Sequence, residues 1–149
     1  MHPHYSVYQA CIIEILGTQQ LGEEDKDTVE VTTIGKYTVA PTGSRFIKYT
    51  EYDRDDPRIS QNTTIKIKDN QQITITRDGH YASQLLLEIG KRHQCHYSTP
   101  AGEMIIGVYT HKMDIDLDEN GGKMSVEYTL DFDSCVVSEN TFKITVNKN

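Results

Sequence analysis

The sequence predicts an all-β protein, a closed or partly open antiparallel meander barrel of about eight to ten strands. Three observations predict it. Apolar and polar residues alternate with a period of two in one run after another, as in strands with one buried and one wet face. Turn-forming residues separate these runs at hairpin spacing. Apolar residues at helical spacing nowhere extend beyond a couple of turns.

Length, composition and charge narrow the class of protein. A chain of 149 residues suits one domain spanning residues 1–149, and no Pro- or Ser-rich linker divides it. With 36% hydrophobic and 25% charged residues it is too apolar for a disordered chain and too polar for a membrane protein. The net charge of −7 disfavours binding to a nucleic-acid phosphate backbone. We therefore expect a soluble protein with neither a nucleic-acid nor a membrane partner.

The first third of the chain predicts strands separated by two polar loops. A first strand gives way to a loop from Leu16 to Asp27, which contains a run of acidic residues. A later strand places Ile47, Tyr49 and Glu51 on one face. Residues 52–61, which are rich in Asp, then predict an exposed loop.

The middle of the chain predicts tight hairpins. Ile65 and Ile67 alternate with polar residues, and so do Ile73 and Ile75. Between these two runs, Asp69-Asn70 supplies two residue types that tolerate the positive φ of a hairpin turn. The other turn signals downstream are Asp78-Gly79, Thr99-Pro100-Ala101-Gly102 and Asn120-Gly121-Gly122.

The last third predicts two long strands. In the first of them one face is apolar and is predicted to be buried: Met124, Val126, Tyr128, Leu130 and Phe132. Glu127 and Asp131 fall on the opposite, solvated face. Phe142, Ile144 and Val146 alternate in the same way in the final strand. Short sequential hairpins favour a barrel over a β-sandwich, which usually needs long crossings between its sheets.

A resemblance to a known family supports the barrel. It is carried by short runs in a fixed order and spacing: Tyr49-Thr50-Glu51, Arg77-Asp78-Gly79, Tyr97 to Gly102, Thr110, Gly121-Gly122 and Tyr128. From about Ile34 to the C-terminus the chain resembles the YwiB-like bacterial family, a domain of unknown function. The resemblance implies a calycin- or lipocalin-like β-barrel and carries over no activity.

One formal motif points to calcium. The pattern Asp116-x-Asp118-x-Asn120-Gly121, with Glu127 at its end, matches the EF-hand loop. An EF-hand needs amphipathic helices on both sides, whereas the flanking segments here alternate as strands do. We therefore interpret the segment as a β-hairpin with a solvated acidic tip.

Other signatures of chemistry are weak. In His93-Gln94-Cys95-His96, a strand would place His93 and Cys95 on one face and His96 on the other, so two ligands at most converge. Three widely spaced cysteines, Cys11, Cys95 and Cys135, predict neither a disulfide framework nor a zinc knuckle, and they favour the cytoplasm. The sequence contains no nucleophile elbow, P-loop or dinucleotide fingerprint, so we assign no catalytic residue, metal ligand or cofactor.

One group of residues remains as a candidate site. Glu51 and Arg77 share parity with apolar residues on strands that should be close neighbours, and they predict an ion pair near one end of the barrel. The pair is either a structural salt bridge or part of a site in which Arg77, with Tyr49 and Tyr97, orients an anionic or polar group of a small ligand. Thr110, one of the residues that carry the resemblance, is grouped with them as a candidate.

Three functions are therefore open. The preferred hypothesis is a module that binds a small molecule in the barrel interior or mouth. The alternative is a structural or protein-interaction domain with a filled barrel, and the third is an enzyme that uses carboxylates at the rim. The sequence leaves the oligomeric state open, a homodimer included.

Overall fold

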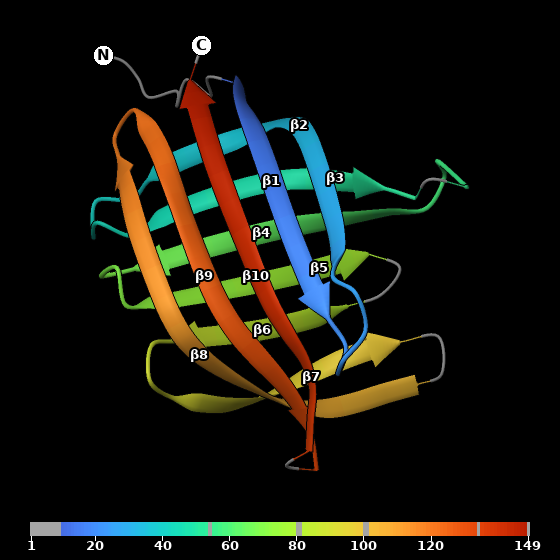
Figure 1. The fold of residues 1–149 in the computed structure, drawn as a ribbon. Coiled ribbons are helices and arrows are strands. Elements are labelled where there is room, and N and C mark those ends of the chain that lie inside the picture. Colours follow the sequence, from blue (N-terminus) through green and yellow to red (C-terminus); the bar gives the residue numbers. More distant parts are fainter. Residues whose placement is uncertain (1–9, 54, 80–81, 100–101, 134, 149) are drawn as a thin grey trace, which may run out of the picture.

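The computed structural model describes residues 10–53, 55–79, 82–99, 102–133 and 135–148, and they form ten β-strands (Figure 1). In chain order the strands are β1 (Ala10–Gln20), β2 (Asp27–Val39), β3 (Arg45–Tyr52), β4 (Ser60–Lys68), β5 (Gln72–Gly79), β6 (Ser83–Glu88), β7 (Arg92–Thr99), β8 (Gly102–Asp118), β9 (Gly121–Phe132) and β10 (Cys135–Lys148).

The strands close into one barrel in which sequence neighbours are also spatial neighbours. Each strand pairs antiparallel with the next, and β10 returns to pair with β1 along most of its length. Figure 1 shows two layers: β3 to β7 run across the rear, while β1, β8, β9 and β10 cross in front of them. This confirms the all-β antiparallel meander barrel that the alternation and the turn signals predict.

The core consists of the inward residues of both layers. In β4 and β5, Ile65, Ile67 and Ile73 are almost fully buried, and Ile144 and Val146 meet them from β10. Burying each such side chain stabilises the fold by about 1.5–3 kcal/mol relative to leaving it in water. The period-two patterns of the sequence thus mark the barrel interior correctly for these strands.

Two of the predicted hairpins are confirmed in detail. Asp69 and Asn70 form the β4–β5 turn with φ of +54° and +52°, as a two-residue hairpin requires. Asp118 pairs with Gly121 across the β8–β9 turn, so the calcium-like motif lies on a hairpin and not between helices. Glu127 lies further along β9, opposite Lys112. Within the described part of the chain, no group of three or more His, Cys, Asp or Glu residues could hold a metal ion.

The polar loop predicted from Leu16 to Asp27 is wrong at its start. Strand β1 continues to Gln20, because its polar residues are paired on both sides: Thr18 lies opposite Thr28 of β2 and Thr141 of β10. The Thr18 and Thr141 hydroxyls hydrogen-bond each other. The loop predicted over residues 52–61 is also shorter, because β3 reaches Tyr52 and β4 begins at Ser60. The centre of the Thr99–Gly102 turn lies outside the described residues.

The end of β9 reverses the predicted burial. Asp131 is only 7% exposed and Phe132 is 44% exposed. Asp131 accepts hydrogen bonds from Arg92 Nε at 2.9 Å and Nη2 at 2.6 Å. Its cross-strand partner is Gly107, where a Cβ would stand 2.5 Å from the carboxylate oxygens. The missing side chain on the neighbouring strand therefore lets a charged residue on the outer face become buried against its ion-pair partner.

One end of the barrel is closed by polar contacts. The buried Arg45 donates from Nη1 to the Leu117 carbonyl oxygen at 2.9 Å, and its Nη2 hydrogen-bonds Asn70 Oδ1. The Tyr37 hydroxyl donates to the Asp118 carbonyl oxygen at 2.7 Å. These bonds join β2 and β3 to the end of β8 and to the β4–β5 turn, so the barrel does not open at this end.

Candidate functional site

The barrel opens where β2 and β3 separate. These two strands pair only over Lys36–Val39 and Arg45–Lys48, and within the described strands residues 27–35 of β2 pair with β1 alone. The separation begins at Gly35, where an added Cβ would lie 2.3 Å from the Lys48 carbonyl oxygen. Only a residue without a side chain lets β3 pass this close before it turns into the rear layer.

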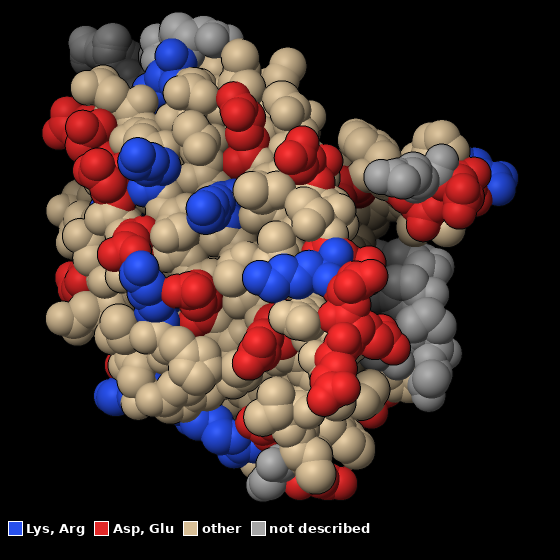
Figure 2. All heavy atoms as spheres, in the orientation of Figure 1, with Lys and Arg blue, Asp and Glu red and all other residues tan. Residues whose placement is uncertain are grey.

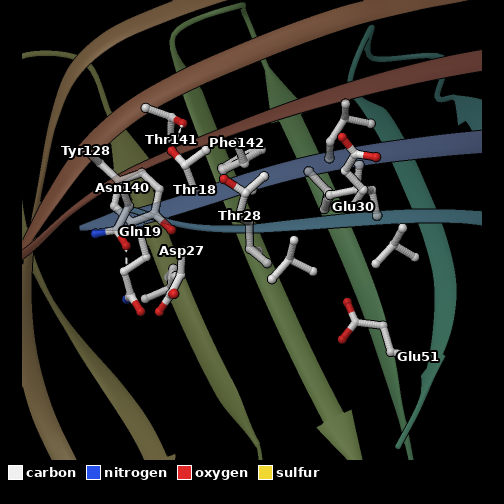
Figure 3. A pocket seen from close by; sticks show the side chains of 18 of the residues that line it. Thr18, Gln19, Asp27, Thr28, Glu30, Glu51, Tyr128, Asn140, Thr141 and Phe142 are labelled. Carbon is white, nitrogen blue, oxygen red and sulfur yellow. Dashed lines mark hydrogen bonds between the residues drawn. The ribbon is translucent and has the colours of Figure 1, made fainter. Parts of the chain in front are cut away.

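A cavity of about 750 Å³ lies behind this opening (Figure 3). Its inner walls are core side chains of the rear and front layers, including Ile65, Ile75, Leu85, Phe142 and Ile144. Val29 and Val31 of β2 border it on the open side. The volume falls within the range of about 300–1,000 Å³ that is typical of small-molecule pockets.

Arg77 is the cationic residue of this cavity. Its Nη2 lies 3.9 Å from Glu51 Oε1, and the side chains are 31% and 35% exposed. The Thr63 hydroxyl, between them on β4, donates to Glu51 Oε1 at 3.5 Å. Arg77 Nε is buried and has no hydrogen-bond partner among the described residues. A buried donor of this kind normally bonds to something, so a ligand or a water molecule is expected to accept from it.

Tyrosines surround Arg77. Burial raises the pKa of Tyr49 well above its usual range, the nearby Glu51 raises this pKa further, and Arg77 opposes the shift. Burial also raises the pKa of Tyr128, again opposed by Arg77, while the neighbouring Tyr97 raises it. The Tyr49 and Tyr128 phenols are therefore neutral at physiological pH, so each can both donate and accept a hydrogen bond.

A second polar group, which the sequence does not predict, lies at the other end of the same cavity. Gln19 Nε2 donates to Asn140 Oδ1 at 3.1 Å, and the buried Asn140 donates from Nδ2 to Ser138 Oγ at 3.0 Å. Figure 3 shows Thr18 and Asp27 beside them, with Glu51 set apart from this group. The polar residues of β1 belong to a segment that the sequence predicts as a loop, so alternation could not reveal this group.

The structure brings together four of the five candidate residues. Tyr49, Glu51, Arg77 and Tyr97 all line the cavity. Thr110 does not: it lies fully buried on β8, and its hydroxyl has no hydrogen-bond partner among the described residues. The Glu51–Arg77 contact predicted from strand parity is present, although both side chains are partly exposed rather than buried.

The His/Cys segment forms a structural contact. His93 Nε2 lies 2.9 Å from Glu88 Oε1, and Lys91 Nζ lies 3.2 Å from Glu88 Oε2. The hydrogen bonds from His93 and then Lys91 lower the pKa of Glu88. Cys95 is buried and His96 is exposed, so the segment does not converge on one point.

Comparisons with known proteins give one family match and one structural match. The model of a family described as a domain of unknown function, DUF1934, matches residues 13–144. The crystal structure of the YwiB protein from Bacillus subtilis superposes with a TM-score of 0.80. That match has 18% sequence identity and covers 95% of this chain and 92% of the other, so it shows a shared fold. A search of curated proteins found no match.

No helix in the described residues is long and apolar enough to cross a membrane.

Proposed function

The chain belongs to the DUF1934 family of YwiB-like domains, and we propose that its barrel binds a small molecule carrying an anionic or polar group in the cavity behind β2. Arg77, Tyr49 and Tyr97 orient that group. The negative charge of Glu51 disfavours ligands that carry several negative charges. The observation that carries the proposal is the buried, unpartnered Nε of Arg77 inside a cavity of about 750 Å³.

Arg77 is suited to this role because it is only loosely engaged. At 3.9 Å its contact with Glu51 is longer than a charge-assisted hydrogen bond, which is usually about 2.7–2.9 Å. A carboxylate could accept from Nε and one Nη at once, which is the bidentate geometry that a guanidinium favours. The hydroxyls of Tyr49 and Tyr128, whose pKa values are raised, would supply further donors without adding charge.

The charge of the lining narrows the ligand. Asp27, Glu30 and Glu51 also line the cavity, whereas Arg77 is the one cation among its described lining residues. This excess of negative charge penalises a polyanion such as a nucleoside triphosphate. A ligand with one carboxylate or with neutral polar groups, attached to an apolar body that contacts the isoleucine walls, fits the site best.

Two broader features belong to the same proposal. A barrel whose interior cavity opens on one side supports the lipocalin- or calycin-like relationship. No disulfide joins Cys11, Cys95 and Cys135, all of which lie in the described residues, and Cys135 is exposed. An exposed, unbridged thiol supports a reducing compartment and hence a cytoplasmic location.

The test is ligand binding measured on wild type and on Arg77→Met. We would screen small mono- and dicarboxylates, neutral polar compounds and phosphates by thermal shift, and titrate the hits by calorimetry. Because hydrogen bonds to a charged group contribute about 1.5–3 kcal/mol, Arg77→Met should weaken binding of a carboxylate hit by about 10- to 100-fold.

Arg58→Met is the matched control, because Arg58 lies in an exposed loop and pairs only with Asp56 among the described residues. It should leave binding unchanged. Hits that bind Arg77→Met as tightly as wild type would contradict the proposal. The absence of any hit, together with no small molecule retained by protein purified from its host, would also contradict it. The alternative of a structural or protein-interaction domain without a ligand would then stand.

A further inference from the structure

The outer edge of β2 from Asp27 to Gly35 is an unprotected sheet edge. Over these residues the strand pairs with β1 in an unbroken register, from Gln19 opposite Asp27 to Cys11 opposite Gly35. Its other side meets no strand in the described part of the chain. Proteins usually guard such edges with proline, bulges or inward charges. This stretch has no proline and no bulge, and its only charged residues, Asp27 and Glu30, both border the cavity.

The side chains along this edge favour pairing with another strand. Six of the nine residues are β-branched, the residue class that strands prefer: Thr28, Val29, Val31, Thr32, Thr33 and Ile34. Val29, Val31 and Ile34 are 55%, 37% and 71% exposed, which is unusual for neighbouring large apolar residues. Figure 1 shows the lower part of β2 at the margin of the front layer, beside β1.

We propose that a second copy of this chain binds here, β2 against β2 in antiparallel orientation, with the two-fold axis at Val31. A two-fold axis through an antiparallel pair requires one residue to face its own copy. The unpaired stretch, residues 27–35, is centred on Val31. Pairing about that residue therefore uses the whole free edge of both copies.

The cross-strand pairs in this register are compatible. Val31 faces the other Val31, Val29 faces Thr33, and the opposing pairs Thr28–Ile34 and Glu30–Thr32 place no like charges together. Moving the axis to Glu30 would set Glu30 against its own copy, which is unfavourable. Moving the axis to Thr32 would engage Lys36, which already pairs with Lys48 of β3.

Charge complements the pairing at its two ends. The β1–β2 turn of one copy, with the exposed Glu23, Glu24, Asp25 and Lys26, keeps an excess of negative charge and would arrive where β2 of the other copy joins β3. There the exposed Lys36 and Lys48 lie directly opposite each other. Figure 2 shows acidic side chains gathered at the lower right of the molecule, the region of this turn in Figure 1. Opposite charges at both ends favour this dimer and make it sensitive to salt.

The first experiment measures the oligomeric state by sedimentation velocity over a range of protein concentrations. Wild type should dimerise, with a dissociation constant that rises several-fold when the salt concentration increases to 1 M. Val31→Lys should be monomeric, because two lysines would face each other on the axis. Val136→Lys is the control: Val136 is an even more exposed valine, on β10 and outside the proposed interface, so this variant should dimerise like wild type.

The second experiment tests the register with cysteines in a Cys135→Ser background, which removes the exposed native thiol. Val31→Cys should form an intermolecular disulfide on mild oxidation, since position 31 faces its own copy. Val29→Cys should not, because residue 29 faces Thr33 and its copy lies about four residues away along the strands.

The proposal is overturned if wild type stays monomeric at every concentration and Val31→Cys fails to cross-link. It is also overturned if folded Val31→Lys dimerises like wild type, or if Val29→Cys cross-links as readily as Val31→Cys. Circular dichroism establishes that each variant is folded. If Val31→Lys does not fold, the comparison of cross-linking between Val31→Cys and Val29→Cys decides whether the proposal holds.

Discussion

At the scale of single residues, what lies next to a side chain decides its burial and its energetic role. Asp131 is buried because Arg92 binds both of its carboxylate oxygens and Gly107 leaves room for them. Phe132, the next residue, is 44% exposed near the end of its strand. Alternation alone places the two the other way round, because it registers polarity and not the neighbours on adjacent strands.

Alanine substitutions of Phe132 and Phe142 test this difference in burial. Phe132→Ala should reduce the free energy of unfolding by no more than about 1 kcal/mol, as partly exposed positions do. Phe142→Ala should cost about 3–5 kcal/mol, because Phe142 is buried against Tyr128 in the core. Chemical denaturation measures both, and a large loss at Phe132 would mean that its environment is not the exposed one described.

The Arg77–Glu51 pair should couple only weakly in the free protein. Each side chain is about one-third exposed and the atoms are 3.9 Å apart, so a double-mutant cycle with Arg77→Met and Glu51→Gln should give at most about 1 kcal/mol. Denaturation of the two single variants and the double variant supplies the cycle. A coupling of several kcal/mol would favour the structural salt bridge over a ligand site.

At the scale of the elements, close contacts between backbones determine where two strands separate. Local ion pairs stabilise a hairpin whose strands have few backbone pairs. β2 leaves β3 at Gly35, where the Lys48 carbonyl and the Ile13 side chain fill the space that a Cβ would need. The β6–β7 hairpin has little regular pairing between its strands, with Ser83 opposite Tyr97, and relies on side chains such as Glu88 and His93.

Gly35→Ala should destabilise the protein by about 1–3 kcal/mol, the usual range for overpacking. Gly17→Ala is the control, because a Cβ at Gly17 would have nothing within 4 Å. Thermal and chemical denaturation of both variants isolate the steric effect from the general difference between glycine and alanine. Equal effects of the two substitutions would show that β3 does not pass close to Gly35.

The β6–β7 hairpin should contribute a pH-dependent stability. Hydrogen bonds from His93 and Lys91 lower the pKa of Glu88 from its ordinary value of 4.5. The stabilisation is therefore complete above about pH 4.5 and is lost as the pH falls through the lower folded pKa. Glu88→Gln should be less stable than wild type at pH 7, and the difference should shrink in acid.

Denaturation at several pH values measures this difference, with Glu14→Gln on the exposed face of β1 as the control. The control should show no comparable change between pH 7 and pH 3. A Glu88→Gln variant that matches wild type at pH 7 would contradict a stabilising role for the contact.

At the scale of the whole molecule, the barrel has one end closed by polar contacts and one open side. Arg45 and Tyr37 hydrogen-bond to the end of β8 at the closed end, and the divergence of β2 and β3 opens the side. The cavity, the candidate ligand residues and the free edge of β2 all lie at that open side. Ligand binding and self-association, if both occur, would therefore share a border at Val29 and Val31.

Arg45→Met should destabilise the closed end, since it leaves the Leu117 carbonyl oxygen without the Arg45 donor. Charge-assisted hydrogen bonds of this kind contribute about 1.5–3 kcal/mol, so a loss of that size is expected in denaturation. Arg58→Met should change stability by less than about 0.5 kcal/mol, as surface substitutions usually do. Equal effects would show that the closed end depends on packing alone.

The sequence by itself determined the fold class, the turn at Asp69-Asn70, the inward residues of β4, β5 and β10 and the Glu51–Arg77 contact. It could do so because the alternation of strand faces and the conformation of a tight turn depend on residues adjacent in the chain, and strand pairing does not change them. The extension of β1 to Gln20, the burial of Asp131 and the polar group around Asn140 were decided by the tertiary structure. So was the separation of β2 from β3, because each of these depends on contacts between residues far apart in the chain.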